Sequence, residues 1–169
     1  MSIRLLKIFS KFTNVKYIQE PITAGLEQYN CAILICELKI SDDLILKQEV
    51  VKMKQIIDAF YDCVSEAIEK NKGDVQNLFQ GKFHCIFGAP ERLTYPHESA
   101  IKASELIQNK WQGCAHSEHS IFKMAVESGV LNCGMFGVSG RKKYEGIGNL
   151  YTLTETKLQS INWIKTKKY

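Results

Sequence analysis

The sequence predicts an α+β protein in which helices cover a mainly antiparallel sheet. A continuous apolar run, "NCAILICELKI" (residues 30–40), is typical of a buried central strand. A long segment after it repeats apolar residues every three or four positions, as an amphipathic helix does. Two pairs of strands with glycine-containing bends then alternate with two further helical segments. This order of strand, helix, hairpin, helix, hairpin and helix indicates a ferredoxin-like layout.

Length and composition fit one globular domain. The chain has 169 residues, 45% hydrophobic and 24% charged, which is enough to bury a full core. The net charge is only +4, and much of it lies in the tail at 165–169, so we expect no nucleic-acid partner. No apolar run is long enough to predict a transmembrane segment. Several of the six cysteines lie inside apolar runs, which favours reduced thiols and a cytoplasmic location.

Residues 1–26 are predicted to form an amphipathic helical segment that precedes the domain at 27–169. Basic residues separate four apolar residues at helical spacing, Leu5, Ile8, Phe9 and Phe12. A short helix or coiled-coil stub is favoured over membrane contact. In the strand that follows, the first charged residue is Glu37, at or just past the strand end.

The clearest helix is predicted over 43–74. Its apolar residues recur at intervals of three and four, with lysines and glutamates on the other face: Val50, Met53, Ile57, Phe60, Val64 and Ile68. Gly73 follows a lysine-rich last turn and is expected to end this helix.

The second half of the chain repeats a hairpin and a helix. A Gln80-Gly81-Lys82 turn separates the strands "VQNLF" and "FHCIFG", and Pro96 begins the helix "PHESAIKASELIQNKW". A polar loop, "QGCAHSEHS", leads to a second hairpin within "IFKMAVESGVLNCGMFGV". A basic turn, "SGRKKYEGIG", then leads to a last helix in "NLYTLTETKLQSIN".

Three stretches in this order carry a family resemblance: "FGAP" at Phe87–Pro90, "ESGVLNCGMFG", and "YEGIGNLYTLTETKL". From about Cys31 to Leu158 the chain resembles the catalytic domain of class III adenylate and guanylate cyclases. The resemblance implies an antiparallel sheet with helices packed on it. Members of the family usually continue with further strands, whereas here only "SINWIKTKKY" follows the last helix. We therefore expect a C-terminally shortened domain, or one piece of a larger protein.

The resemblance also implies which positions would carry the chemistry, and all of them depart from the family pattern. The two metal-binding aspartates correspond to Glu37 and Gly81. The purine-reading lysine and its acidic partner correspond to Asn77 and Asn149. The ribose-positioning asparagine and the arginine that stabilises the transition state correspond to Thr152 and Thr156. Only Glu37 keeps the chemical character of the residue that it replaces.

These replacements predict a pseudoenzyme. Cyclisation moves negative charge onto a departing pyrophosphate, and two metal ions between the carboxylates activate the attacking oxygen and neutralise that charge. A glycine cannot ligate through a side chain, and loss of the arginine costs on the order of 10³-fold in analogous reactions. In the family one domain supplies the carboxylates, and a second domain supplies the asparagine and the arginine. This chain departs from the pattern on both sides.

The predicted function is that of a pseudo-cyclase in cyclic-nucleotide signalling, acting through a homodimer or through another cyclase-fold chain. Residual binding of a nucleoside triphosphate stays open, with Lys82, Asn77, Asn149 and the basic run 141–143 as candidate contacts. No cofactor is expected, and Mg²⁺ or Mn²⁺ would accompany any bound nucleotide, with Glu37 as the candidate ligand. The alternatives are a working cyclase that uses Glu37 with Glu127 or Glu155, and a platform that kept only the fold.

A zinc site is a further alternative. The stretch "CAHSEH" offers Cys114, His116 and His119, with Cys133 or His84 as a possible fourth ligand. The paired spacing of a zinc finger is missing, so we weigh this site at roughly one in ten against a polar loop.

Overall fold

The structure, a computed structural model, describes residues 25–79, 81–138 and 141–165. The amphipathic helix predicted for 1–26 and the basic tail therefore lie almost entirely outside the described residues. Among the described helices, none combines the length and the apolar character that a membrane crossing requires.

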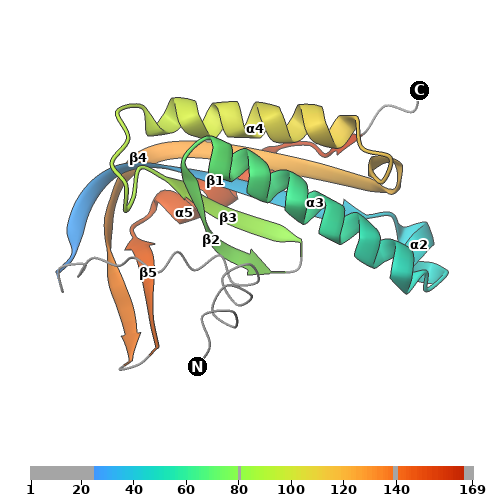
Figure 1. Ribbon diagram of the computed structural model, residues 1–169, viewed down its shortest axis with the longest axis horizontal. Coiled ribbons are helices and arrows are strands. Elements are labelled where there is room, and N and C mark those ends of the chain that lie inside the picture. Colours follow the sequence, from blue (N-terminus) through green and yellow to red (C-terminus); the bar gives the residue numbers. More distant parts are fainter. Residues whose placement is uncertain (1–24, 80, 139–140, 166–169) are drawn as a thin grey trace, which may run out of the picture.

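The predicted α+β architecture with an antiparallel sheet is confirmed (Figure 1). The strands are β1 (Glu27–Ile40), β2 (Gly73–Phe79), β3 (Lys82–Phe87), β4 (Ser120–Val138), β5 (Arg141–Ile147) and β6 (Ile164–Lys165). Their order is β2-β3-β1-β4-β5, and β6 pairs with the beginning of β4. All pairings are antiparallel. The end of β4 leaves the body of the molecule together with β5 as a two-stranded arm (Figure 1).

The helices divide between the two faces of the sheet. Helices α3 (Val50–Lys70) and α4 (Pro96–Gln112) cover one face, and α5 (Leu150–Ser160) covers the other. Strand β1 sends Leu34 and Cys36 into the first core, and Ile33 and Ile35 into the second, because successive side chains of a strand point to opposite faces. The same alternation places Glu37 on the face that α5 covers.

The helix predicted over 43–74 is interrupted, and this part of the prediction is wrong. A short helix, α2 (Asp42–Leu46), ends before α3 begins at Val50, and between them Gln48 has a positive φ of 54°. Val50 is exposed rather than buried, and Ile56 lies in the core in place of the expected Ile57. These positions all lie within the unbroken α3, so the face that this helix turns toward the sheet differs from the expected one.

Three local features also differ from the prediction. The stretch expected to form a second hairpin is one continuous strand, β4, which pairs instead with β5. Helix α3 ends at Lys70, and Gly73 is the first residue of β2 rather than a helix stop. A Cβ atom at Gly73 would lie 2.5 Å from Cε1 of Phe87, so the glycine allows this close contact. The predicted basic turn at 141–143 is the first part of β5, where Lys143 pairs with Glu145 at 3.2 Å.

Candidate functional site

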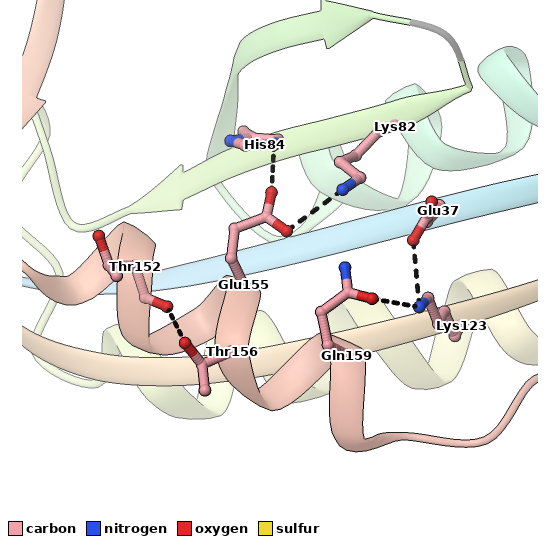
Figure 2. Close-up of polar contacts among 8 residues, drawn as sticks. All are labelled: Glu37, Lys82, His84, Lys123, Thr152, Glu155, Thr156 and Gln159. Atoms are coloured by element: carbon pink, nitrogen blue, oxygen red, sulfur yellow. Dashed lines mark hydrogen bonds and ion pairs between the residues drawn. The ribbon is translucent and has the colours of Figure 1, made fainter.

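Polar side chains gather where α5 crosses strands β3, β1 and β4. Helix α5 buries Leu150, Thr154 and Leu158 against the sheet, and a neighbouring stripe at the same four-residue spacing carries Glu155 and Gln159. The strands contribute the other members. We call the following six residues the polar seam: Glu37, Lys82, His84, Lys123, Glu155 and Gln159 (Figure 2).

Glu155 ties α5 to strand β3. Its Oε2 atom lies 3.2 Å from Nζ of Lys82, and its Oε1 atom lies 3.0 Å from Nε2 of His84. The His84 ring is stacked on the ring of Tyr151, with 6.3 Å between the centroids. Burial lowers the pKa of His84 from its ordinary value, and the nearby Glu155 carboxylate opposes that shift.

Glu37 is balanced by a lysine on the neighbouring strand. In the sheet register it lies directly opposite Lys82 on one side and Lys123 on the other. Its Oε2 atom is buried, forms no hydrogen bond within the described structure, and lies 3.3 Å from Nζ of Lys123. The Lys123 side chain is only 6% exposed, against 25% for Glu37. Lys123 also lies 3.5 Å from Oε1 of Gln159 and 4.6 Å from the centre of the Trp163 ring.

Gly81 forms the bend between β2 and β3 next to this pair. It is buried and has a φ of 78°, and its carbonyl accepts a hydrogen bond from the N–H of Leu38 at 3.0 Å. An added Cβ atom would lie 3.1 Å from the carbonyl oxygen of Leu38. The other position predicted on this hairpin, Asn77, is exposed on β2 opposite His84. The structure thus places Gly81, Lys82 and Glu37 at one end of the sheet.

The remaining predicted positions form a separate, exposed stripe on α5. Asn149 precedes the first turn of the helix, where its side chain makes no capping hydrogen bond. Thr152 and Thr156 are exposed, and Oγ1 of Thr156 donates to the carbonyl of Thr152 at 2.8 Å. In Figure 2 both threonines lie apart from the ion pairs of the polar seam. The chain therefore does not bring these three residues together with Glu37 and Lys82.

The two carboxylates considered for a working cyclase also have lysine partners. Oε1 of Glu127 lies 2.6 Å from Nζ of Lys157, which also donates to the carbonyl of Val126 at 2.9 Å. Glu155 is paired with Lys82, as described above. Neither carboxylate is free of a positively charged neighbour.

The segment predicted as a possible zinc site lines an open groove beside the start of α3. The groove has a volume of about 650 Å³, and His116 and His119 contribute to its wall. His119 pairs with Glu118 at 2.9 Å, while His84 belongs to the polar seam and Cys133 lies on β4. Across the described part of the chain, no three His, Cys, Asp or Glu residues are arranged to hold a metal.

Sequence reasoning missed Lys123, Gln159 and Trp163. A signal for Lys123 was present, because a lysine inside the apolar run "IFKMAVE" shares the face of Ala125 by strand alternation. Its position opposite Glu37 depends on the register between β1 and β4, which the sequence does not show.

No protein-family model matches the chain. Among curated proteins, the uncharacterized protein Rv1320c of Mycobacterium tuberculosis is 23% identical over 125 residues, which are 73% of this chain and 22% of that protein. The chain therefore spans about a fifth of the length of the curated relatives that it matches.

Solved structures share the fold at low sequence identity. The guanylyl cyclase Cya2 is 15% identical with a TM-score of 0.69, and the match covers 80% of this chain and 72% of that one. A bacterial light-regulated adenylyl cyclase is 13% identical with a TM-score of 0.76, over 93% of this chain and 49% of that one. A non-canonical dimeric guanylyl cyclase domain from the fungus Blastocladiella emersonii is 10% identical with a TM-score of 0.67, and the match covers 81% of this chain and 78% of that one. The chain has the fold of the catalytic domains of class III adenylyl and guanylyl cyclases.

Proposed function

We propose that this chain is a cyclase-fold domain that does not cyclise nucleoside triphosphates and that acts by associating with a second cyclase-fold domain. The partner is another copy of the chain or a different chain with this fold. Binding of a nucleoside triphosphate is a residual property of the domain, and its setting is cyclic-nucleotide signalling inside the cell.

The observation that carries this proposal is the bend at Gly81. Gly81 has no side chain that could hold a metal ion, and a Cβ atom added there would lie 3.1 Å from the carbonyl oxygen of Leu38, closer than ordinary contact. Metal-assisted phosphoryl chemistry needs cations that neutralise the departing pyrophosphate. With one carboxylate in place of two, the chain cannot assemble the pair of ions that the family uses.

The exposed stripe on α5 supports the same conclusion from the other side. Thr152 and Thr156 carry no charge, and the hydroxyl of Thr156 is turned back onto its own helix. Neither residue can stabilise developing negative charge as an arginine does. A partner with an intact set of carboxylates would therefore gain no arginine from this chain.

Exposed apolar side chains support association. Val138 and Ile147 lie on the β4–β5 arm and Leu153 on α5, and they are 71%, 52% and 52% exposed. These side chains would leave water if a second domain packed against the arm and α5. The guanylyl cyclase domain from Blastocladiella emersonii, which shares the fold, is described both as a non-canonical dimer and as a monomer.

Catalysis is tested by incubating the purified chain with Mn²⁺ and ATP or GTP and measuring the cyclic nucleotide. We expect no product above the reaction without protein. Product that disappears in the Glu37→Gln variant would establish turnover by this chain and refute the proposal. Thermal melts with and without each nucleotide then separate a nucleotide-binding domain from a platform that kept only the fold.

Association is tested by sedimentation velocity over a range of protein concentrations. We expect a concentration-dependent dimer, or a stable complex with a second cyclase-fold chain, that is weakened by Val138→Glu. The matched control is Val51→Glu, because Val51 is similarly exposed, at 74%, but belongs to the first turn of α3. That turn follows α2, which lies at the opposite end of the molecule from the arm (Figure 1). Equal effects of the two substitutions would argue against the arm as the contact surface.

A further inference from the structure

We propose that the ammonium group of Lys123 takes the place beside Glu37 that a divalent cation would need. A lysine of the chain itself thereby neutralises Glu37, the one carboxylate that remains at the two metal-binding positions. The inference goes beyond the proposed function, because it concerns what balances Glu37 and does not depend on catalysis or on association.

The register of the sheet places the two side chains together. Glu37 and Lys123 are direct partners across the antiparallel pair of β1 and β4, so their side chains leave the same face as close neighbours. Because Oε2 of Glu37 is buried, a group inside the protein must balance its charge. The ammonium of Lys123, at 3.3 Å, supplies that charge.

Contacts from other elements hold the ammonium in position. Gln159 approaches it from α5, and the Trp163 ring lies against it in a cation–π arrangement. Trp163 is placed there because Ile164 pairs with Phe122 in the β6–β4 ladder, one residue away from Lys123. The segment after α5 therefore closes over the ion pair.

The surroundings of Glu37 disfavour a divalent ion. The carboxylate has a lysine opposite it on each neighbouring strand, Lys82 and Lys123, so an added cation would meet positive charge from both sides. The adjacent bend at Gly81 supplies no second carboxylate. The residues present therefore do not fit the pair of metal ions that the fold family implies.

Terbium luminescence tests the inference without a nucleotide. The chain has two tryptophans, and Trp163 lies at the site while Trp111 is buried in the other core. Light absorbed by Trp163 sensitises a Tb³⁺ ion bound close to it. We expect no saturable luminescence from the wild-type chain. We expect a saturable signal from Lys123→Asp, which sets two carboxylates opposite each other.

Two control variants locate the signal. Adding Glu37→Gln to Lys123→Asp should abolish the luminescence, because one carboxylate of the pair is lost. Lys157→Met removes an ion-paired lysine outside the polar seam and should leave the protein as dark as the wild type. A saturable wild-type signal that Glu37→Gln removes would overturn the inference. A folded Lys123→Asp variant that stays dark would overturn it as well.

Stability measurements keep the inference testable if Lys123→Asp fails to fold. Lys123→Met should lower the Tm because it leaves the Glu37 carboxylate unpaired, and adding Glu37→Gln should restore about 2–4 °C or more of that loss. If the double variant melts no higher than Lys123→Met, Lys123 does not neutralise Glu37 and the inference fails. Cyclic-nucleotide production by the wild type would refute the proposed function but leave these results unchanged.

Discussion

Gly81→Asp, which returns a carboxylate to the bend between β2 and β3, should destabilise the domain without creating a metal site. The backbone at position 81 has a φ of 78°, a conformation that favours glycine. A Cβ atom there would lie 3.1 Å from the carbonyl oxygen of Leu38, which is closer than ordinary contact. The substitution therefore meets both a backbone and a packing penalty.

The expected loss in the free energy of unfolding is the sum of these two penalties. A left-handed conformation costs an L-residue about 1–2 kcal/mol, and aspartate lies toward the lower end because it tolerates this region better than most residues. Moving the Leu38 backbone by a few tenths of an ångström adds about 1 kcal/mol, as mild overpacking does. We expect the free energy of unfolding to fall by about 2 kcal/mol. For a chain of this size that corresponds to a Tm lower by about 4–8 °C.

Urea denaturation with and without Mn²⁺ measures both parts of this prediction. Gly81→Asn is the matched control, because it has the same shape and backbone demand but no charge. We expect the two variants to lose similar stability, and Mn²⁺ to change neither, since Glu37 stays paired with Lys123. The reasoning is refuted if Gly81→Asp is as stable as the wild type. It is also refuted if Mn²⁺ stabilises Gly81→Asp saturably and leaves Gly81→Asn unchanged.

Three further predictions concern the charges of Glu155, His84 and Glu66. Glu155→Gln should lower the free energy of unfolding by about 1 kcal/mol, because Lys82 loses a partly exposed ion-pair partner. Urea denaturation at low salt should show the loss, and an equal loss at high salt would contradict an ionic origin. Burial lowers the pKa of His84 below its ordinary 6.5, so the unfolded chain binds a proton at this residue more readily than the folded chain does. The free energy of unfolding should therefore be highest above about pH 6.5 and should fall as the pH drops below that value. As the pH falls below 6.5, the Tm of the wild type should fall more steeply than the Tm of His84→Gln. Equal dependence of the two Tm values on pH would exclude the effect. The ion pairs with Lys110 and Lys70 together lower the pKa of Glu66 to about 2, so carboxyl NMR should find Glu66 ionised until strongly acidic pH, and Lys110→Met should raise that pKa. An ordinary pKa for Glu66 in the wild type would show that the pair does not form in solution.

Periodicity and turn residues predicted most of the elements. Strand β1, the β2–β3 hairpin around Gly81, and helix α4 beginning at Pro96 all appear where their local patterns place them. The helix between β1 and the β2–β3 hairpin was predicted too long, because the break at Gln48 is a backbone feature with no glycine or proline to mark it. Gly73 was assigned to a helix end, whereas its role depends on Phe87, which lies far along the chain. Local patterns therefore predicted the kind of each element better than its ends.

The candidate site was predicted only in part, for the same reason. The family resemblance assigned Glu37 and Gly81 to the two metal-binding positions, and in the structure Gly81 accepts a hydrogen bond from Leu38, next to Glu37, while Lys82 lies directly opposite Glu37. Sequence comparison by position could not reveal that Lys123 lies opposite Glu37. The pairing depends on the register of β1 against β4, and a shift of one residue would send Lys123 to the other face.

Which chemical groups are available follows from the amino-acid sequence alone. A glycine at 81 offers no side-chain metal ligand, and threonines at 152 and 156 offer no positive charge, whatever their surroundings, because these are properties of each residue alone. How the remaining charges are balanced depends instead on which side chains the fold packs together. Burial makes an unpaired charge costly, so the packing of β4, α5 and Trp163 around Lys123 makes this lysine the counterion of Glu37.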